Sequence, residues 1–451
     1  MEKKIEVIGE KLVYQGDCIA RYKGFTVFVP HLIPGERAEV VVTGKRKSYA
    51  QGRILKLITA SQYRVEPLCP YHFCLKRNEH NACGGCSWQH IKYEHQLYWE
   101  KKIFKEVCSQ IKSAVLDNAG INGLENPWNF RHKIQIPVSA HRGGVISGFY
   151  MASSHEIVDI ENCQIQSDAG NNVYRAVKRL IRQIAGGSGR TNIRHILIRV
   201  NSSSSEGLLC FVTRTNKLEG VEEIKRLVSK ELPIIKGIFR NVNSRETNVI
   251  MGPNTVKIAG RNSMEDIING IRYLVSIESF FQTNPAQAAH LYSFVKDLVA
   301  GSKVVLDLYS GSGGIALQVA GSAEAVYGIE ENRMAVEDAR YSAQLNNIKN
   351  AKFISGKVEN SLFSLVREKG LNMNDAAVII NPPRAGCSGS FLEMLLRVNP
   401  KNIVYVSCNP STLARDIKIL NAYEPTHAKI FDMFPHSYHM ESVVKLARKI
   451  V

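Results

Sequence analysis

The sequence predicts an α/β protein in which a C-terminal, doubly wound and mostly parallel sheet follows a small N-terminal β-barrel and a β-rich central region. Short strands with a period of two fill residues 1–58, and further strand-like stretches run through residues 127–275. From about residue 276, apolar strands alternate with helical runs, which is typical of a parallel sheet covered by helices. The expected domains are therefore residues 1–60, 61–275 and 276–451.

The composition is that of an ordinary globular protein, with 44% hydrophobic and 22% charged residues in a chain of 451. A chain of this length exceeds what one hydrophobic core usually serves. No apolar run approaches the roughly 18 residues of a membrane span, and the start lacks the apolar stretch of a signal peptide. We therefore expect a cytoplasmic protein with no membrane contact.

The charge balance is basic, with 58 Lys and Arg residues against 41 Asp and Glu, for a net charge of +17. Such an excess favours a polyanionic partner, most simply nucleic acid, although a basic surface can also serve solubility alone. Cations neutralise phosphates while aromatic rings stack on unpaired bases. The expected RNA-binding run on the barrel combines both kinds of residue: Lys45, Arg46, Lys47 and Arg53 around Tyr49.

Ten cysteines are too few for a disulfide scaffold in a chain of this length, yet four of them fall between Cys69 and Cys86. Such local clustering indicates metal or cluster binding, or catalysis. Together with Cys163, these thiols could supply the four ligands of a [4Fe–4S] cluster or of a tetrahedral zinc ion. A segment without metal is the third alternative. Three histidines keep zinc open: His72, His80 and His90.

A glycine-rich loop follows the apolar strand that contains Asp307, and Gly311 and Gly314 lie in this loop. Glycine lets the backbone turn sharply and approach a ligand closely. Glu330 ends the next strand about 20 positions later, where an acidic residue typically binds ribose hydroxyls. No Lys-Ser/Thr follows the loop, so a phosphate-binding P-loop is excluded. The pattern favours an adenosine ligand without a phosphate chain, such as S-adenosylmethionine, unless the glycines only form a tight turn.

Two more strand ends carry polar residues that should face the same crevice, namely Asn381 and Cys408. A cysteine at the end of a buried strand is a candidate nucleophile, whereas most buried cysteines are inert small hydrophobes. Glu441 begins an apolar strand near the C-terminus, close to His436 and His439. Its carboxylate is a candidate general base or only a charge at the edge of a strand.

Six C-terminal motifs, in this order, resemble the RNA uracil-C5-methyltransferase family: FFQTN (280–284), DLYSGSGG, GIE, NPPR, SCNP and DMFPH…HMES. The N-terminal stretch VIGEKLVYQGDCIARYKGFTVFVPHLIPGE resembles the TRAM domain, an OB-like RNA-binding barrel. The segment CP…CGGCSWQH, with the later Cys163, resembles the iron–sulfur segment of the branch that modifies rRNA. The resemblance therefore covers the whole chain and implies a Rossmann-like methyltransferase domain at its C-terminal end.

The resemblance also implies roles for individual residues. Cys408 falls at the family's nucleophile and Glu441 at its general base. The family binds S-adenosylmethionine at the positions of Gln282, Tyr309 and Glu330, and it usually has Asp where this chain has Asn381. The expected cofactor residues are Gln282, Tyr309, Gly311, Gly314, Glu330 and Asn381. The expected ligands of a [4Fe–4S] cluster are Cys69, Cys83, Cys86 and Cys163, with Cys69 preferred to Cys74 because it keeps the family's Cys-Pro context.

The family mechanism is methylation of uracil C5 after a cysteine adds to C6, on a base that is splayed out or flipped into the pocket. The cysteine segment and the barrel favour 23S rRNA, with a tRNA uracil-C5-methyltransferase as the alternative. Nothing in the sequence indicates a protein partner, and we expect a monomer. An exocyclic-amine methyltransferase, suggested by NPPR, needs no thiol. A non-catalytic RNA assembly factor would not need Gln282, Cys408 and Glu441 together.

Overall fold

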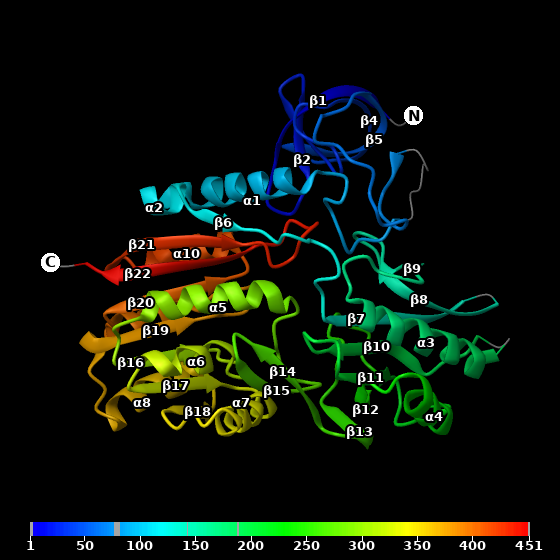
Figure 1. Cartoon of the computed structure of the whole chain (residues 1–451). Helices are drawn as coiled ribbons and strands as arrows, with labels where there is room; N and C mark the ends of the chain where they lie inside the picture. The colour runs from blue at the N-terminus through cyan, green and yellow to red at the C-terminus, as the bar shows by residue number, and fades with distance from the viewer. Residues whose placement is uncertain (1–2, 76–81, 142, 187–188, 450–451) are drawn as a thin grey trace.

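The computed structural model describes residues 3–75, 82–141, 143–186 and 189–449, and its elements form three regions (Figure 1). The N-terminal barrel lies above helix α1 (Tyr93–Cys108) at the top of the view. The C-terminal α/β region lies at the lower left, and the central region lies at the lower right. The predicted fold class, a barrel and a β-rich central region before a Rossmann-like α/β region, is confirmed.

Five strands close the N-terminal barrel in the order β1-β2-β3-β5-β4. Their bounds are β1 (Lys4–Leu12), β2 (Cys18–Tyr22), β3 (Phe25–Val29), β4 (Arg37–Lys45) and β5 (Tyr49–Thr59). Buried and exposed residues alternate along β1, so that Ile5 and Val7 face the interior and Glu6 faces solvent. Gly52 allows β5 to approach β4 closely, because a Cβ atom there would clash with Val40.

The C-terminal sheet has eight strands in the order β18-β17-β16-β19-β20-β22-β21-β6. The strands from β18 to β20 run parallel, and β22 is antiparallel to both of its neighbours. The strands are β6 (Gly120–Asn122), β16 (Val304–Leu308), β17 (Ala325–Glu330), β18 (Ala351–Ser355), β19 (Ala376–Ile380), β20 (Asn402–Ser407), β21 (Tyr423–Phe431) and β22 (Glu441–Arg448). The helices are α5 (Pro285–Val299), α6 (Gly314–Val319), α7 (Arg333–Leu345), α8 (Val358–Glu368), α9 (Gly389–Val398) and α10 (Pro410–Ile419), with 3₁₀ turns at Ala320–Ser322 and Met373–Asp375.

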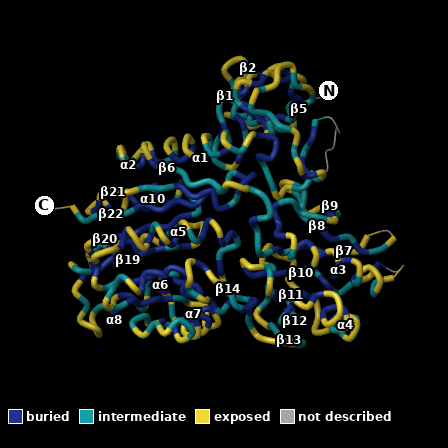
Figure 2. Tube along the Cα trace, in the orientation of Figure 1, coloured by how far each residue is buried: buried dark blue, intermediate teal, exposed yellow. Residues whose placement is uncertain are grey.

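Helices cover both faces of this sheet, and its central strands are buried while the outer sides of the helices are exposed (Figure 2). Along β16, Leu306 and Leu308 pack in the core that contains α8, α9 and α10. Val305 points the other way, into the core that contains α5, α6 and α7. Burial on both faces explains why these strands are almost continuously apolar in the sequence.

The central region contains a second sheet in the order β13-β12-β11-β10-β7-β8-β9. Alternate residues of β10 pack in two different cores. Ile196 and Ile198 pack under the helices α3 (Asp168–Ala185) and α4 (Val221–Glu231), whereas Leu197 packs against the C-terminal region. The central sheet therefore packs against the C-terminal α/β region. Its elements are β7 (Lys133–His141), β8 (Gly144–Tyr150), β9 (Ile157–Asp159), α3 (Asp168–Ala185), β10 (Ile193–Val200), β11 (Gly207–Thr213), α4 (Val221–Glu231), β12 (Ile235–Val242) and β13 (Asn254–Gly260), followed by the hairpin β14 (Ser263–Ile268) and β15 (Ile271–Ser276).

A connecting segment runs from the barrel to the C-terminal sheet through α1, a 3₁₀ turn at Ser109–Ile111, α2 (Ala114–Asp117) and β6. By position in the chain this segment falls in the central range, yet β6 pairs in parallel with β21 and extends the C-terminal sheet. Tyr93 of α1 donates a 2.7 Å hydrogen bond to Asp432. The connecting segment therefore fastens the barrel side of the molecule to the edge of the α/β sheet.

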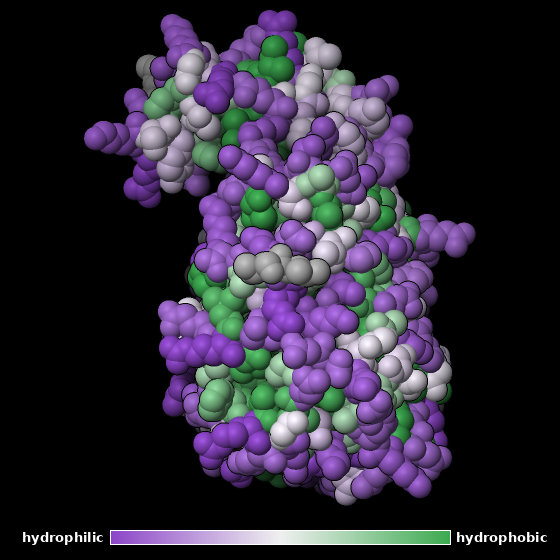
Figure 3. All heavy atoms as spheres, turned by 90° about the vertical axis from the view of Figure 1, so that its left-hand side faces the viewer, coloured by the Kyte–Doolittle hydropathy of each residue, from purple (hydrophilic) through white to green (hydrophobic). Residues whose placement is uncertain are grey.

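Within the described part of the chain, none of the helices combines the length and apolar character needed to cross a bilayer. On the face shown in Figure 3, hydrophilic side chains surround smaller groups of apolar ones.

Candidate active site and cysteine cluster

A pocket opens at the carboxyl ends of β16 and β19. The parallel register of these strands pairs Leu308 with Ile380, which brings the residues after each strand end together. The Asn381 N–H donates to Leu308 O at 3.3 Å. The pocket is lined by Phe280, Phe281, Gln282, Tyr292, Asp307, Tyr309, Ser310, Gly311, Ser312, Gly314, Ile315 and Asn381, which include five of the six residues expected to bind the cofactor.

The loop between β16 and α6 has an unusual backbone, with positive φ at Tyr309 (63°), Gly311 (54°) and Gly313 (80°). Glycine adopts these angles freely, whereas such a conformation costs about 1–3 kcal/mol at a residue like Tyr309. Tyr309 is held by a 3.3 Å hydrogen bond from its hydroxyl to Glu359 and by edge-on packing against Phe391. Backbone strain of this kind concentrates at ligand-binding sites.

Glu330, the sixth expected cofactor residue, ends β17 beside this loop. Its Oε2 accepts a 3.0 Å hydrogen bond from the Gly311 N–H, and its Oε1 accepts a 2.8 Å hydrogen bond from the Asn332 N–H. A carboxylate offers about four lone-pair sites, so both oxygens retain acceptor capacity for the hydroxyls of a ribose.

Asp307 lines the pocket and was assigned no role from the sequence, although a carboxylate inside an otherwise apolar strand is a detectable signal. Its side chain is buried, and its Oδ2 accepts a 2.9 Å hydrogen bond from the Ala316 N–H. Among the described residues, its Oδ1 has no hydrogen-bond partner. Burial raises the pKa of Asp307 to about 7. A buried acceptor here, together with Glu330, fits a ligand that carries both an ammonium group and a ribose, as S-adenosylmethionine does.

Cys408 and Glu441 are brought together by the antiparallel pairing of β20 and β22. Ser407 pairs with Ser442, so the residue after Ser407 lies opposite the residue before Ser442. Cys408 is half-buried at the turn into α10, where Asn409 caps the helix by accepting from the Ser411 N–H. The candidate nucleophile and the candidate base therefore share one end of the sheet.

Burial shifts the pKa of both groups upward, and the charge of Glu441 adds to the shift of Cys408. Burial raises the pKa of the Cys408 thiol to about 11, with a further upward contribution from Glu441. Burial raises the pKa of the Glu441 carboxyl to about 8. At neutral pH the thiol is therefore protonated, and the carboxyl is a stronger base than an ordinary glutamate once it has lost its proton.

Arg384 opposes both shifts. This arginine follows Asn381 and two prolines, and its charge lowers the pKa of Cys408 and of Glu441. The Asn409 side chain donates a 3.1 Å hydrogen bond to Arg384 O, which ties the NPPR and SCNP motifs together. In the sequence Arg384 is only part of the NPPR motif, and its effect on both pKa values shows that its charge acts on the candidate nucleophile and on the candidate base.

Tyr14 is a second residue near the nucleophile that the sequence did not single out. It lies in the turn between β1 and β2 of the barrel, and its ring packs edge-on against Tyr438 at 6.0 Å. Burial raises the pKa of Tyr14 to about 12, and the charges of Cys408 and Glu441 contribute in the same direction. The N-terminal barrel therefore reaches the site, which no local sequence pattern indicates.

The four expected cluster ligands converge between the cysteine-rich segment and the loop after β9. Burial is the main cause that raises the pKa of Cys83, to about 12, and the charges of Cys163 and Cys69 add to it. Burial is also the largest cause that raises the pKa of Cys86, and the charges of Cys163, Cys83 and Cys69 add to it. Cys74 instead lines a separate pocket with Leu55, Phe73 and His90.

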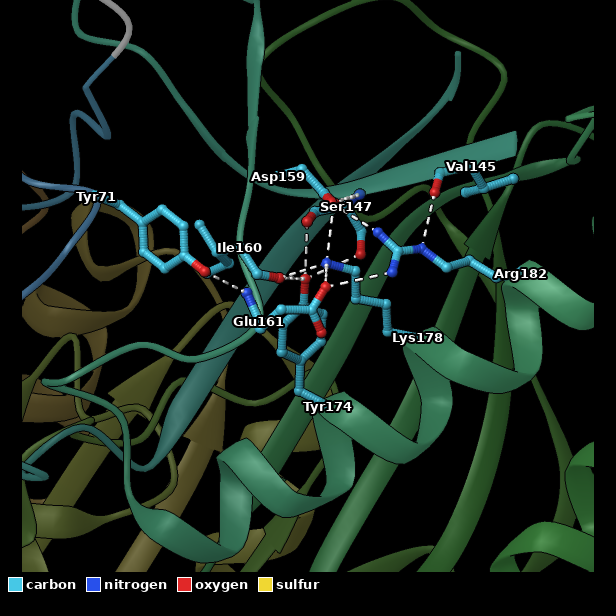
Figure 4. A network of polar contacts seen from close by, with 9 residues as sticks. All are labelled: Tyr71, Val145, Ser147, Asp159, Ile160, Glu161, Tyr174, Lys178 and Arg182. Carbon is cyan, nitrogen blue, oxygen red and sulfur yellow. Dashed lines mark hydrogen bonds and ion pairs between the residues drawn. The ribbon is translucent and has the colours of Figure 1, made fainter. Parts of the chain in front are cut away.

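The loop that carries Cys163 is clamped to the cysteine-rich segment by a network of polar contacts (Figure 4). The Glu161 N–H donates a 3.0 Å hydrogen bond to the Tyr71 hydroxyl. The buried Lys178 contacts Glu161 at 2.7 Å and Asp159 at 2.9 Å, and Arg182 contacts the same two carboxylates. Gly84 packs closely on the turn after β8, because a Cβ atom there would lie 2.7 Å from Ala152 N.

The expected RNA-binding run lies at the turn between β4 and β5. Lys45, Arg46 and Lys47 are exposed, and Lys45 Nζ lies 5.9 Å from the centre of the Phe25 ring. The Phe28 and Tyr49 rings pack edge-on at 5.4 Å. Cations and aromatic rings therefore share one edge of the barrel.

Two family models match the chain. The model of tRNA (uracil-5-)-methyltransferases matches residues 243–449, and the model of the TRAM domain matches residues 2–55. The first range contains the whole pocket and both candidate catalytic residues, and the second covers most of the barrel.

Relatives and solved structures agree with these matches. An uncharacterized RNA methyltransferase of Bacillus cereus is 36% identical over 98% of this chain and 96% of its own length. Another, from Caldanaerobacter subterraneus subsp. tengcongensis, is 37% identical over 99% and 98%. The crystal structure of Pyrococcus abyssi tRNA (uracil-54, C5)-methyltransferase in complex with S-adenosyl-L-homocysteine superimposes with a TM-score of 0.76 at 26% identity, covering 98% of this chain and 100% of that one.

Proposed function

This chain belongs to the S-adenosylmethionine-dependent RNA (uracil-5-)-methyltransferases, and from that premise we propose that it methylates C5 of a uridine in 23S rRNA through a covalent adduct between Cys408 and uracil C6. The observation that carries this proposal is the opposition of Cys408 and Glu441 at the end of the β20–β22 ladder, within the influence of Arg384.

The first task of the site is to form a thiolate. Uracil C5 is a poor nucleophile, and addition of a Cys408 thiolate to C6 produces an enolate that is nucleophilic at C5. The positive charge of Arg384 stabilises the thiolate, since it lowers the pKa of Cys408. S-adenosylmethionine, when bound, supplies the electrophilic methyl group.

The second task is to remove the C5 proton after methylation. Glu441 lies opposite Cys408, and its raised pKa makes its ionised carboxylate a stronger base for this proton than an ordinary glutamate. The electron pair of the C5–H bond then forms the C5–C6 double bond, and Cys408 leaves as a thiolate. We assign the nucleophile to Cys408 and the base to Glu441, because a thiol is the better nucleophile and a buried carboxylate is the better base.

We assign the cofactor contacts to Gln282, Tyr309, Gly311, Gly314, Glu330 and Asn381, and the pocket that five of them line supports this assignment. The assigned domains are residues 1–60 for the RNA-binding barrel, 61–275 for the central domain and 276–451 for the methyltransferase domain. We expect the protein to act on RNA as a monomer.

We further propose that Cys69, Cys83, Cys86 and Cys163 hold a [4Fe–4S] cluster. The charges of Cys69 and Cys163 act on the pKa of both Cys83 and Cys86, which supports one shared site. Four thiolates suit a four-iron cluster, which would join the two cysteine-bearing segments by metal–sulfur bonds.

The choice of 23S rRNA over tRNA rests on the cysteine segment and the barrel. tRNA is the specific second candidate, since the structural neighbour from Pyrococcus abyssi is a tRNA (uracil-54, C5)-methyltransferase. The test is to incubate the protein with a methyl-labelled donor and equal amounts of unmodified 23S rRNA and tRNA. We expect label in 5-methyluridine of the rRNA, and label confined to tRNA would make tRNA the substrate.

A further inference from the structure

Three histidines meet between the barrel and the cysteine-rich segment, and none of them is among the cluster ligands assigned above. His31 follows β3 of the barrel, and His72 and His90 lie on either side of the CGGC motif. One ring nitrogen from each histidine lies within 4.8 Å of the others, which no other set of three metal-ligating residues achieves in the described ranges. The ring centroids are 5.4 to 5.7 Å apart.

Two of the rings are oriented by backbone groups. His72 Nδ1 donates a 2.9 Å hydrogen bond to Phe73 O, which places the lone pair of the neutral ring on Nε2. His31 hydrogen-bonds the backbone of Ser87, while its Nδ1 has no hydrogen-bond partner among the described residues. Metal-bound histidines usually donate one ring N–H to a backbone carbonyl or a similar acceptor. The lone pair of the other ring nitrogen then binds the metal.

His90 gives a second indication of a ligand. Its side chain is 2% exposed, and within the described part of the chain neither of its ring nitrogens has a hydrogen-bond partner. Buried polar groups are almost always satisfied, so an imidazole with two unmade hydrogen bonds requires an explanation. A bound ion would accept one of its lone pairs.

The surroundings hold the three rings in place. Phe73 stacks on the His31 ring at 4.4 Å. Arg64 donates to His31 O at 2.7 Å, and its charge is balanced by the fully buried Glu36 through contacts of 2.6 and 2.7 Å. A metal ion at the rings would therefore not face an uncompensated positive charge.

We propose that His31, His72 and His90 bind one divalent transition-metal ion, with Zn²⁺ as the occupant, and that this ion fastens the barrel to the cysteine-rich segment. Three neutral imidazoles are a donor set that suits zinc, with a fourth position left for water. Because His31 comes from the barrel and the other two from the segment, the ion acts as a cross-link between them. This site is independent of the [4Fe–4S] assignment.

The test measures zinc and iron in the full-length protein, purified anaerobically and dialysed against zinc-free buffer after loading with one equivalent of Zn²⁺. We expect one zinc per chain, and X-ray absorption at the zinc edge should give nitrogen or oxygen neighbours at about 2.0–2.1 Å, without sulfur at about 2.3 Å. His90→Ala should retain at least tenfold less zinc. His427→Ala, at an exposed histidine of β21, is the matched control and should retain the wild-type amount.

Cys83→Ser separates this site from the cluster, since this variant should lose iron and keep its zinc. Zinc bound through sulfur, unchanged zinc in His90→Ala, or no zinc retained by the wild type would each overturn the proposal. If His90→Ala fails to fold, the X-ray absorption spectrum of the wild-type protein at the zinc edge still decides between histidine and cysteine ligands.

Discussion

The backbone N–H of Gly311 donates a 3.0 Å hydrogen bond to Glu330 Oε2, so the carboxylate expected to bind ribose also holds the glycine loop in place. The two residues come from adjacent parallel strands, β16 and β17, whose ends are aligned by the pairing of Leu308 with Ile329. The loop conformation and the acceptor for the ligand are therefore set by one side chain.

Glu330→Ala should weaken the binding of S-adenosylmethionine by about 1–3 kcal/mol, because it removes charge-assisted hydrogen bonds to the ribose. The loss should reach the upper end of that range if the Gly311 loop also relaxes. Titration calorimetry on both proteins measures the difference. Glu337→Ala, on the exposed side of α7, is the control and should bind normally. Equal affinity of Glu330→Ala and wild type would remove Glu330 from the site.

The reactivity of Cys408 should increase with pH throughout the range from 7 to 10, because only the thiolate is nucleophilic and burial raises its pKa to about 11. Below that pKa, each pH unit should raise the alkylation rate by about tenfold. Iodoacetamide labelling followed by peptide mass spectrometry resolves Cys408 from the other cysteines.

Two variants should shift this profile in opposite directions. Arg384→Gln removes a charge that lowers the pKa of Cys408, so alkylation at a fixed pH should slow. Glu441→Gln removes a charge that raises this pKa, so alkylation should accelerate at pH values where Glu441 is ionised, above about 8. Shifts of the same sign in both variants would contradict the arrangement of charges around Cys408.

Replacement of Lys45, Arg46 and Lys47 by Ala should reduce the salt dependence of RNA binding. These residues are exposed at one edge of the barrel, and each cation bound to a phosphate releases about 0.7 counterions from single-stranded RNA. The slope of log K against log salt should therefore become shallower by about 2. Affinity for S-adenosylmethionine should not change, and an unaltered slope would show that the run does not contact RNA.

Removal of Cys69 should eliminate bound iron, whereas removal of Cys74 should not. The charge of Cys69 raises the pKa of Cys83 and of Cys86, whereas Cys74 lines another pocket. Iron and sulfide analysis of anaerobically purified Cys69→Ser and Cys74→Ser checks this. Cys69→Ser should also melt at a lower temperature, because cluster binding contributes to folding. Iron lost only from Cys74→Ser would exchange the two assignments. Zinc bound through sulfur, with no iron and no sulfide, would show that zinc takes the place of the cluster.

Local sequence patterns predict the fold and the pocket because both depend on short-range features. A short apolar run identifies β16, the glycines identify its loop, and the parallel arrangement places Asn381 near Tyr309. Contacts between distant segments leave no such pattern. The approach of Tyr14 to Cys408 depends on how the barrel docks, and the pairing of β6 with β21 depends on the path of the connecting segment. The sequence likewise does not predict that His31 meets His72 and His90, since these two histidines lie at least 41 positions away in the chain.

The chemistry itself is tested by separating the roles of Cys408 and Glu441. Cys408→Ala should abolish methyl transfer, because without addition to C6 the C5 carbon is not nucleophilic enough to react. RNA binding should persist, since the substitution removes one half-buried sulfur and no charge at neutral pH. A methyl-transfer assay beside a filter-binding assay checks both expectations. Full turnover by Cys408→Ala would overturn the proposed mechanism.

Glu441→Gln should trap the reaction after methylation. Addition and methyl transfer need only Cys408, but the C5 proton then has no base to accept it, so the C6–sulfur bond cannot break. Protein linked to methylated RNA should accumulate as a band that survives denaturing electrophoresis, and Cys408→Ala, alone or combined with Glu441→Gln, should give no such band. An amine methyltransferase or a non-catalytic RNA-binding protein would give no adduct in any variant. Release of methylated RNA by Glu441→Gln at the wild-type rate would remove only the base assignment. His439 would then be the next residue to test, since burial lowers its pKa to about 4 and leaves it neutral at pH 7.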